Sequence, residues 1–130
     1  MEIIEYNHEW KEKWDNFVLA SNNGTMFHLQ KFFDYHKPGK FTFNHLMFVE
    51  KGEIKAVLPG SLKDGIFESP VGASYGSIVT GDITFKEALN YVEMLIDYGK
   101  KNGFKEFYLT PAPMIYEQYQ NQNLDFAMLW

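Results

Sequence analysis

Residues 84–103 read "TFKEALNYVEMLIDYGKKNG", and this stretch predicts the longest helix of the chain. Thr84 and Glu87 form a capping-box pattern at its start, and Gly103 suits the left-handed backbone that often ends a helix. The following stretch, "FKEFYLTP" at 104–111, predicts a strand. The apolar face of the helix is expected to contain Phe85, Ala88, Leu89, Val92, Leu95 and Ile96.

Shorter patterns on either side predict the remaining elements. Upstream we expect a strand over 2–6, helices over 8–20 and 29–39, and antiparallel strands over 41–50, 54–60 and 65–70. Downstream we expect a helix over 112–120 and a last strand over 124–130. The sequence therefore predicts an α/β (α+β) fold, with a mixed, mostly antiparallel sheet flanked by helices. The expected order is strand, helix, helix, three strands, helix, strand, helix, strand.

Composition narrows the class of protein. A chain of 130 residues fits one domain spanning 1–130, and its 45% hydrophobic content suffices for a sizeable core. The net charge is -5 and every one of the 12 cations is Lys, which argues against a partner such as duplex nucleic acid. The sequence has no Cys and no apolar stretch long enough to span a membrane. We therefore expect a cytoplasmic protein with no membrane partner.

A glycine-containing segment, "FESPVGASYGSIVTG" at 67–81, precedes the long helix. The spacing of Gly72, Gly76 and Gly81 matches neither a dinucleotide fingerprint nor a Walker loop. Two interpretations remain. The glycines either let a ligand approach the main chain in a groove, or serve turns and bulges alone.

Candidate catalytic side chains are few. The histidines His8, His28, His36 and His45 stand singly, without the spacing of metal ligands, so no metal is expected. Ser69 and Ser77 lack the G-x-S-x-G elbow of a hydrolase nucleophile. For proton transfer the candidate pair is Glu68, as a base, and Tyr116, as an acid. The alternative is an exposed strand glutamate and a half-buried tyrosine.

Four segments of the chain together resemble the FemAB-like branch of the GNAT acyltransferase superfamily. They are "GTMFHLQKFFDY" at 24–35, "LPGSL" at 58–62, "ESPVGASYGSIV" at 68–79 and "LTPAPMIY" at 109–116. The resemblance covers nearly the whole chain. It implies a strand over 76–79 before the long helix, which would run parallel to the strand at 105–110 in a right-handed unit joined by the helix. It implies transfer of an acyl or aminoacyl group to an amine, from an acyl-CoA or aminoacyl donor lying against the strand before the long helix. The residues that would bind donor or substrate there are Ser69, Gly72, Tyr75, Gly76, Ser77 and Ile78.

The sequence departs from that family just before the long helix. The usual Q/R-x-x-G-x-G/A loop for the pyrophosphate is replaced by "VTGDITF", whose Asp82 would repel phosphate. Two hypotheses follow: an acyltransferase domain acting on a small or cell-wall-precursor-type amine acceptor, and a non-catalytic domain of the same fold that binds an acceptor or a protein partner. The resemblance also implies a second GNAT-like domain as a partner. The apolar strand expected at 124–130 predicts a homodimer through edge pairing.

Overall fold

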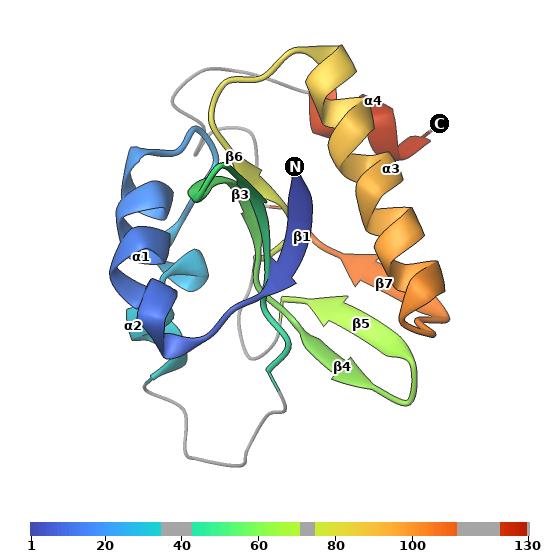
Figure 1. Cartoon of the computed structure of the whole chain (residues 1–130), viewed down its shortest axis with the longest axis horizontal. Coiled ribbons are helices and arrows are strands. Elements are labelled where there is room, and N and C mark those ends of the chain that lie inside the picture. Colours follow the sequence, from blue (N-terminus) through green and yellow to red (C-terminus); the bar gives the residue numbers. More distant parts are fainter. Residues whose placement is uncertain (35–42, 71–74, 112–122, 130) are drawn as a thin grey trace.

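The structure of the protein is a computed structural model, and it describes residues 1–34, 43–70, 75–111 and 123–129 (Figure 1). The elements follow one another as β1 (Glu2–Glu5), η1 (His8–Trp10), α1 (Lys11–Ala20), η2 (Met26–His28), α2 (Gln30–Phe33), β2 (Leu46–Glu50), β3 (Glu53–Leu58), β4 (Ser61–Lys63), β5 (Ile66–Ser69), β6 (Val79–Thr80), α3 (Phe85–Lys101), β7 (Glu106–Leu109) and α4 (Asn123–Leu129), where η denotes a 3-10 helix. The predicted mixed α/β fold is confirmed.

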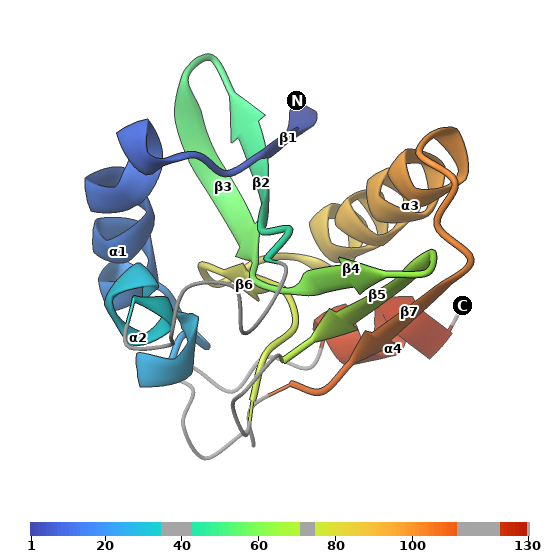
Figure 2. The ribbon, with the colours of Figure 1, turned by 90° about the horizontal axis from the view of Figure 1, so that it is seen from below.

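Two sheets, not one, form the centre of the molecule. The first has the strand order β1-β2-β3-β6 and is antiparallel throughout. The second has the order β4-β5-β7, in which β5 and β7 run parallel. Figure 2 shows the two sheets diverging from the region of β6. The sequence-based expectation of one central sheet is therefore wrong, because the strands form two sheets.

The first sheet is covered by helices on both faces, with α1 and α2 on one side and α3 on the other (Figure 1). Successive side chains of a strand point to opposite faces, so each central strand contributes to two cores. Leu46 and Phe48 of β2 pack in the core beneath α3 with Tyr91. Met47 and Val49 pack in the other core, which contains Trp14 of α1 together with Val18, Val57 and Val79. This explains why four consecutive residues of β2 are buried.

The long helix begins and ends where the sequence predicts. The Thr84 side chain accepts a hydrogen bond from the Glu87 N–H, the Glu87 side chain caps the Thr84 N–H, and Gly103 has a φ of 75°. Its buried face differs from the predicted one, because Phe85 and Ile96 are exposed. The buried residues are Ala88, Tyr91, Leu95 and Gly99. Tyr91 and Gly99 belong to this face because Phe48 contacts the tyrosine ring and Phe107 leaves no room for a side chain at 99.

An additional strand divides the predicted antiparallel run. After β3 the chain bends at Gly60, where an added Cβ would lie 2.6 Å from the Phe67 ring. It then forms β4, which pairs with β5 and not with the first sheet. The apolar pattern of the sequence groups "LPGSL" with the preceding strand, because nothing in that pattern marks a change of sheet.

The last described segment, Asn123–Leu129, is helical, so the strand predicted over 124–130 is wrong. Leu124 and Met128 pack against the core beneath α3, and Ala127 is buried. Spacings of three and four residues match a helix, and packing against α3 overrides the alternation that favoured a strand. The edge pairing expected there has no strand to form it. The helix predicted over 112–120 lies outside the described residues.

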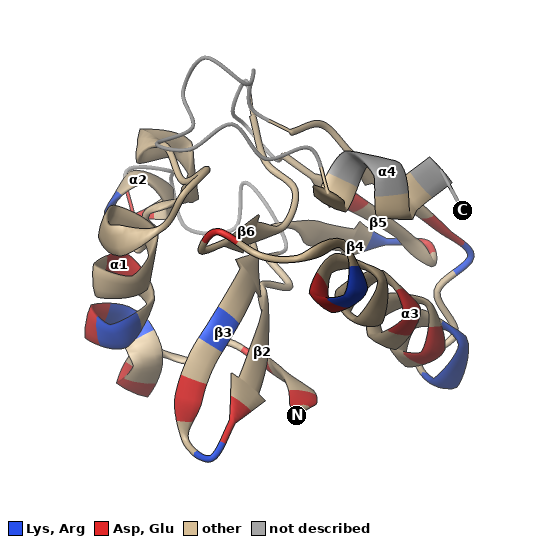
Figure 3. Cartoon of the chain, turned by 90° about the horizontal axis from the view of Figure 1, so that it is seen from above, with Lys and Arg blue, Asp and Glu red and all other residues tan. Residues whose placement is uncertain are grey.

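The surface carries charges of both signs. Lys, Asp and Glu alternate along the outer faces of α1 and α3 and on the β2–β3 hairpin (Figure 3). No helix among the described residues has the length and hydropathy required to cross a membrane.

The two sheets meet where the segment before β6 passes the end of β7. Gly76 donates its N–H to the Thr110 carbonyl at 2.8 Å and forms a parallel bridge with Pro111. This bridge is isolated, and the expected pair of parallel strands joined by α3 is wrong, because β6 lies in the first sheet and β7 in the second. The main body of β7 instead pairs with β5, and Val79 of β6 pairs with β3. We call this contact region, made by Ser69, Gly76, Ser77 and Thr110, the sheet junction.

Gly76 tests whether the sheet junction is closely packed. A Cβ at this position would contact Ser69 Oγ and lie 2.6 Å from the Pro70 nitrogen, so something must shift to admit it. We expect Gly76→Ala to lower the free energy of unfolding by about 2 kcal/mol or more. At Gly81 no atom lies within 4 Å of an added Cβ, and Gly81→Ala should change stability by less than about 0.5 kcal/mol. Equal effects in urea denaturation would contradict this packing.

Candidate functional site

The residues predicted to bind a donor converge on the sheet junction. Ser69 Oγ accepts a hydrogen bond from the Ser77 N–H at 2.7 Å, and the Ser69 carbonyl accepts one from the Thr110 N–H at 2.7 Å. Ile78 is buried, and the Tyr75 ring lies 5.9 Å from the ring of Phe27, centroid to centroid. Gly72 lies outside the described residues. The Ser69 side chain therefore links the segment before β6 to the end of β5, while the Tyr75 ring packs against η2.

Backbone conformation at the sheet junction is unusual. Ser77 has a φ of 74°, in the left-handed region that side-chain-bearing residues rarely adopt. Such a residue costs on the order of 1 kcal/mol and persists where its surroundings fix it. Here the hydrogen bond to Ser69 and near-complete burial supply that constraint.

His28 connects the helical layer to the sheet junction. Its ring is buried, Nδ1 accepts the Thr25 N–H at 3.0 Å, and Nε2 lies 2.9 Å from the Gly76 carbonyl oxygen. A carbonyl can only accept, so Nε2 carries the proton and the ring is the neutral Nε2–H tautomer. Burial lowers the pKa of His28, which keeps it in this form. The His28 carbonyl accepts from the Trp14 indole at 2.7 Å, which ties α1 to the same point.

The edge of β6 that faces away from β3 is covered by the end of the α1 segment. Asn23 donates from Nδ2 to the Ile78 carbonyl at 2.9 Å and accepts from the Thr80 N–H at 2.9 Å. The Asn22 N–H donates to the Thr80 carbonyl at 2.9 Å. These three bonds occupy main-chain groups with which an extended ligand would otherwise pair.

The N-terminus of α3 is also occupied by the chain itself. Glu87 Oε1 lies 3.1 Å from the Thr84 N–H, and Thr84 Oγ1 accepts the Glu87 N–H at 3.2 Å. A phosphate binds at such a terminus through free N–H groups and the positive end of the helix dipole. A carboxylate already uses both features here, and the nearby Asp82 adds negative charge.

Glu68, the candidate base, is exposed on β5 and lies opposite Tyr108 of β7. The Tyr108 hydroxyl donates to Glu106 at 2.5 Å, and this bond is the main cause that raises the pKa of Tyr108. Tyr116, the candidate acid, lies outside the described residues. The pairing of Glu68 with Tyr116 therefore stays a prediction.

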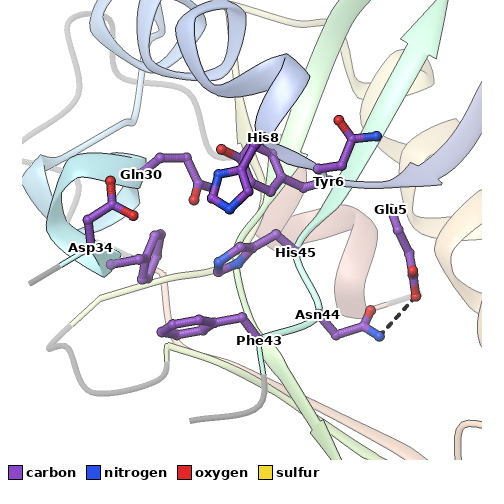
Figure 4. Close-up of a pocket in the computed structure, with 10 residues that line it drawn as sticks. Glu5, Tyr6, His8, Gln30, Asp34, Phe43, Asn44 and His45 are labelled. Carbon is purple, nitrogen blue, oxygen red and sulfur yellow. Dashed lines mark hydrogen bonds between the residues drawn. The ribbon is translucent and has the colours of Figure 1, made fainter. Parts of the chain in front are cut away.

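A pocket of about 300 Å³ opens where β1 ends, β2 begins and α2 passes. Figure 4 shows Gln30, His8, Tyr6 and His45 gathered at its centre, with Asp34 at one end and Asn44 hydrogen-bonded to Glu5 at the other. We call it the His45 pocket. Its lining comprises Glu5, Tyr6, Asn7, His8, Gln30, Phe33, Asp34, Phe43, Asn44 and His45.

Unpaired polar atoms distinguish the His45 pocket. Tyr6 Oη, Gln30 Nε2 and Asn44 Oδ1 are all buried and have no hydrogen-bond partner among the described residues. Leaving a buried polar group unpaired costs roughly 1–3 kcal/mol, so native proteins seldom keep several together. Such a cost is tolerated where a site serves a ligand.

His45 forms the floor of the pocket as a neutral ring. Burial lowers its pKa to about 3. Nδ1 accepts the Gly60 N–H at 3.1 Å, so the proton resides on Nε2. The ring stacks on Phe43, with centroids 4.9 Å apart, and lies 4.5 Å from that of Phe33. The neutral imidazole of His45 and the rings of Phe33 and Phe43 thus form one side of the pocket.

Carboxylates set the electrostatic potential of the pocket. Burial raises the pKa of Tyr6 to about 12, and the charges of Asp34 and Asp15 act in the same direction. Asp15 is buried and accepts the Gln30 N–H at 2.6 Å, and Asp34 pairs with Lys11 at 2.5 Å. The phenol therefore stays protonated and can donate a hydrogen bond.

Sequence reasoning missed the pocket, because its residues come from separate segments. Tyr6, Gln30 and Asn44 carry no motif, and His45 stood as one of four scattered histidines. Its lone position beside a strand gave no spacing signal. Among the described residues, no three His, Asp or Glu side chains are grouped closely enough to hold a metal ion.

These observations define a mixed α/β domain with two diverging sheets and a polar-lined pocket. No family model and no curated protein sequence matches the chain. Its fold is similar to that of a point mutant of TTHA1254 from Thermus thermophilus, known from a crystal structure, with a TM-score of 0.53. The likeness covers 99% of this chain and 85% of that one at 12% sequence identity, so it concerns the fold alone.

The buried histidines predict a pH-dependent stability. His45 titrates near pH 6.5 when unfolded and near 3 when folded, so below about pH 6.5 the unfolded state binds the extra proton. The stabilisation is complete above that pH and falls by about 1.4 kcal/mol per pH unit toward the folded value. His28 acts in the same direction.

Urea denaturation of wild type and His45→Asn between about pH 7 and pH 5 measures the contribution of His45 to the pH dependence of stability. Asn retains an acceptor for the Gly60 N–H, and carboxylate titration is common to both proteins. The stability difference should therefore shrink as the pH falls. His8→Asn serves as a matched control for the loss of an exposed imidazole. Parallel curves for wild type and His45→Asn would refute the assignment.

Proposed function

We propose that this chain is a GNAT-like domain that binds a ligand or partner without itself carrying out acyl transfer. The observation that carries the proposal is the closed edge of β6. Asn22 and Asn23 already bond the main-chain groups of Ile78 and Thr80, along the strand where the resemblance to the GNAT superfamily would place an acyl donor.

Two further features support the proposal. The capping box of Thr84 and Glu87 uses the α3 terminus that would face the pyrophosphate of coenzyme A. The sheet junction is packed tightly, since Gly76 has no room for even a methyl group. An acyl donor that paired with this edge of β6 would have to displace the hydrogen bonds of Asn22 and Asn23.

The competing hypothesis is the acyltransferase. It assigns Glu68 as the base and Tyr116 as the acid, acting on an amine acceptor at the same strand. The exposure of Glu68 on β5 leaves it accessible for such a role. The acyltransferase hypothesis requires the Asn22–Asn23 segment to move away from β6, whereas binding of a ligand in the His45 pocket requires no such movement.

Acetyl-coenzyme A separates the two hypotheses. We expect isothermal calorimetry with the whole chain to show no saturable binding at micromolar concentrations, because donor-facing N–H groups are already bonded and Asp82 and Glu87 oppose phosphate. Amide NMR spectra should show no shifts at Ser77 or Thr80. A dissociation constant in the low micromolar range, with shifts at those amides, would overturn the proposal in favour of the enzyme.

A further inference from the structure

The His45 pocket lies apart from the strand to which the resemblance points, and its chemistry identifies a ligand class. We propose that it binds a small organic cation that also carries a hydrogen-bond acceptor. This inference rests on the proposed function, since it names what the domain would bind.

Charge around the pocket favours a cation. Glu5 and Asp34 line it, and Asp15 lies directly behind Gln30. Lys11 offsets one of these three carboxylates by pairing with Asp34. The remaining charge is negative: Glu5 lines the pocket and Asp15 accepts the Gln30 N–H beside it, and neither is paired with Lys11. An anionic ligand would be repelled, and a cation attracted.

The walls suit an organic cation better than a bare metal ion. The rings of Phe33, Phe43 and His45 form one cluster, with centroids 4.5, 4.9 and 5.3 Å apart. Tyr6 lies edge-on to the neutral His45 ring at 5.8 Å. Aromatic faces attract ammonium groups by the ring quadrupole, more strongly where water is excluded. A metal ion would instead need converging oxygen ligands, and the phenylalanines supply none.

Hydrogen-bond donors in the wall of the His45 pocket explain why the ligand should carry a hydrogen-bond acceptor. Gln30 is 3% exposed, and its Nε2 has two N–H groups that no described residue accepts. His45 Nε2–H is a second donor, because Nδ1 is used by Gly60. A carbonyl or hydroxyl oxygen of the ligand would accept hydrogen bonds from these donors. Asn44 Oδ1 and the carboxylates would accept hydrogen bonds from the ammonium group of the ligand. The pocket thus offers donors to the acceptor of the ligand, and acceptors and aromatic rings to its ammonium group.

The test is an NMR titration of the isotope-labelled chain with glycinamide, which carries both an ammonium and a carbonyl group. N-acetylglycinamide, which keeps the carbonyl but lacks the charge, is the matched control. Nα-acetyl-lysine amide distinguishes a cation presented on a protein side chain from a free one. We expect saturable shifts of the Gln30, His45 and Gly60 amides with one or both cations, weaker at high salt, and none with N-acetylglycinamide.

Variants connect the binding to the named groups. Asp34→Asn should weaken binding about threefold, and Glu93→Gln, the same charge change on the exposed face of α3, should leave it unchanged. Gln30→Met removes the buried donors at similar volume. It should weaken binding about fivefold or more while the melting temperature stays equal to or above that of wild type.

The outcomes are separable. Equal shifts with N-acetylglycinamide, or binding insensitive to both Asp34→Asn and Gln30→Met, would overturn the cation site. A loss of melting temperature in Gln30→Met would also count against it, because the amide would then be structural. Titrating acetyl-coenzyme A into the same sample reports on the proposed function alone, so either proposal can fail while the other holds.

Discussion

The absence of a side chain at Gly76 is the constraint on which the rest of the structure depends. The chain must pass from the end of the second sheet into β6 of the first, and at this point Ser69 and Pro70 lie too close for a Cβ. Close approach lets the Gly76 carbonyl reach His28 and its N–H reach Thr110. Through His28 the same point holds Trp14, and with it helix α1. One glycine therefore connects both sheets to the helical layer.

How far the sequence predicts the fold depends on how local each signal is. The capping box at Thr84 and the left-handed backbone at Gly103 act within a few residues, and the structure contains both of them. The division into two sheets depends on Phe67 filling the space beside Gly60, a contact that no local pattern reports. The final helix was mistaken for a strand because its packing partner, α3, lies far away in the sequence.

The same distinction applies to the sites. The resemblance to GNAT proteins predicts Ser69, Gly76 and Ser77 as donor- or substrate-binding residues, and the structure brings them together at the contact between the two sheets. A short run of small residues predicts close backbone approach without telling whether a ligand or another strand approaches. The His45 pocket could not be predicted, since burial and unpaired atoms are properties of the folded chain.

The connection between His28 and Gly76 is central to this architecture, because it joins the helical layer to both sheets. The most direct measurement is a long-range proton–nitrogen NMR spectrum of the His28 ring across the acidic range. We predict a neutral ring protonated at Nε2, with that proton slow to exchange and persisting below the ordinary histidine pKa of about 6.5. A ring that titrates near 6.5 in the folded protein, or that carries its proton on Nδ1, would contradict this connection.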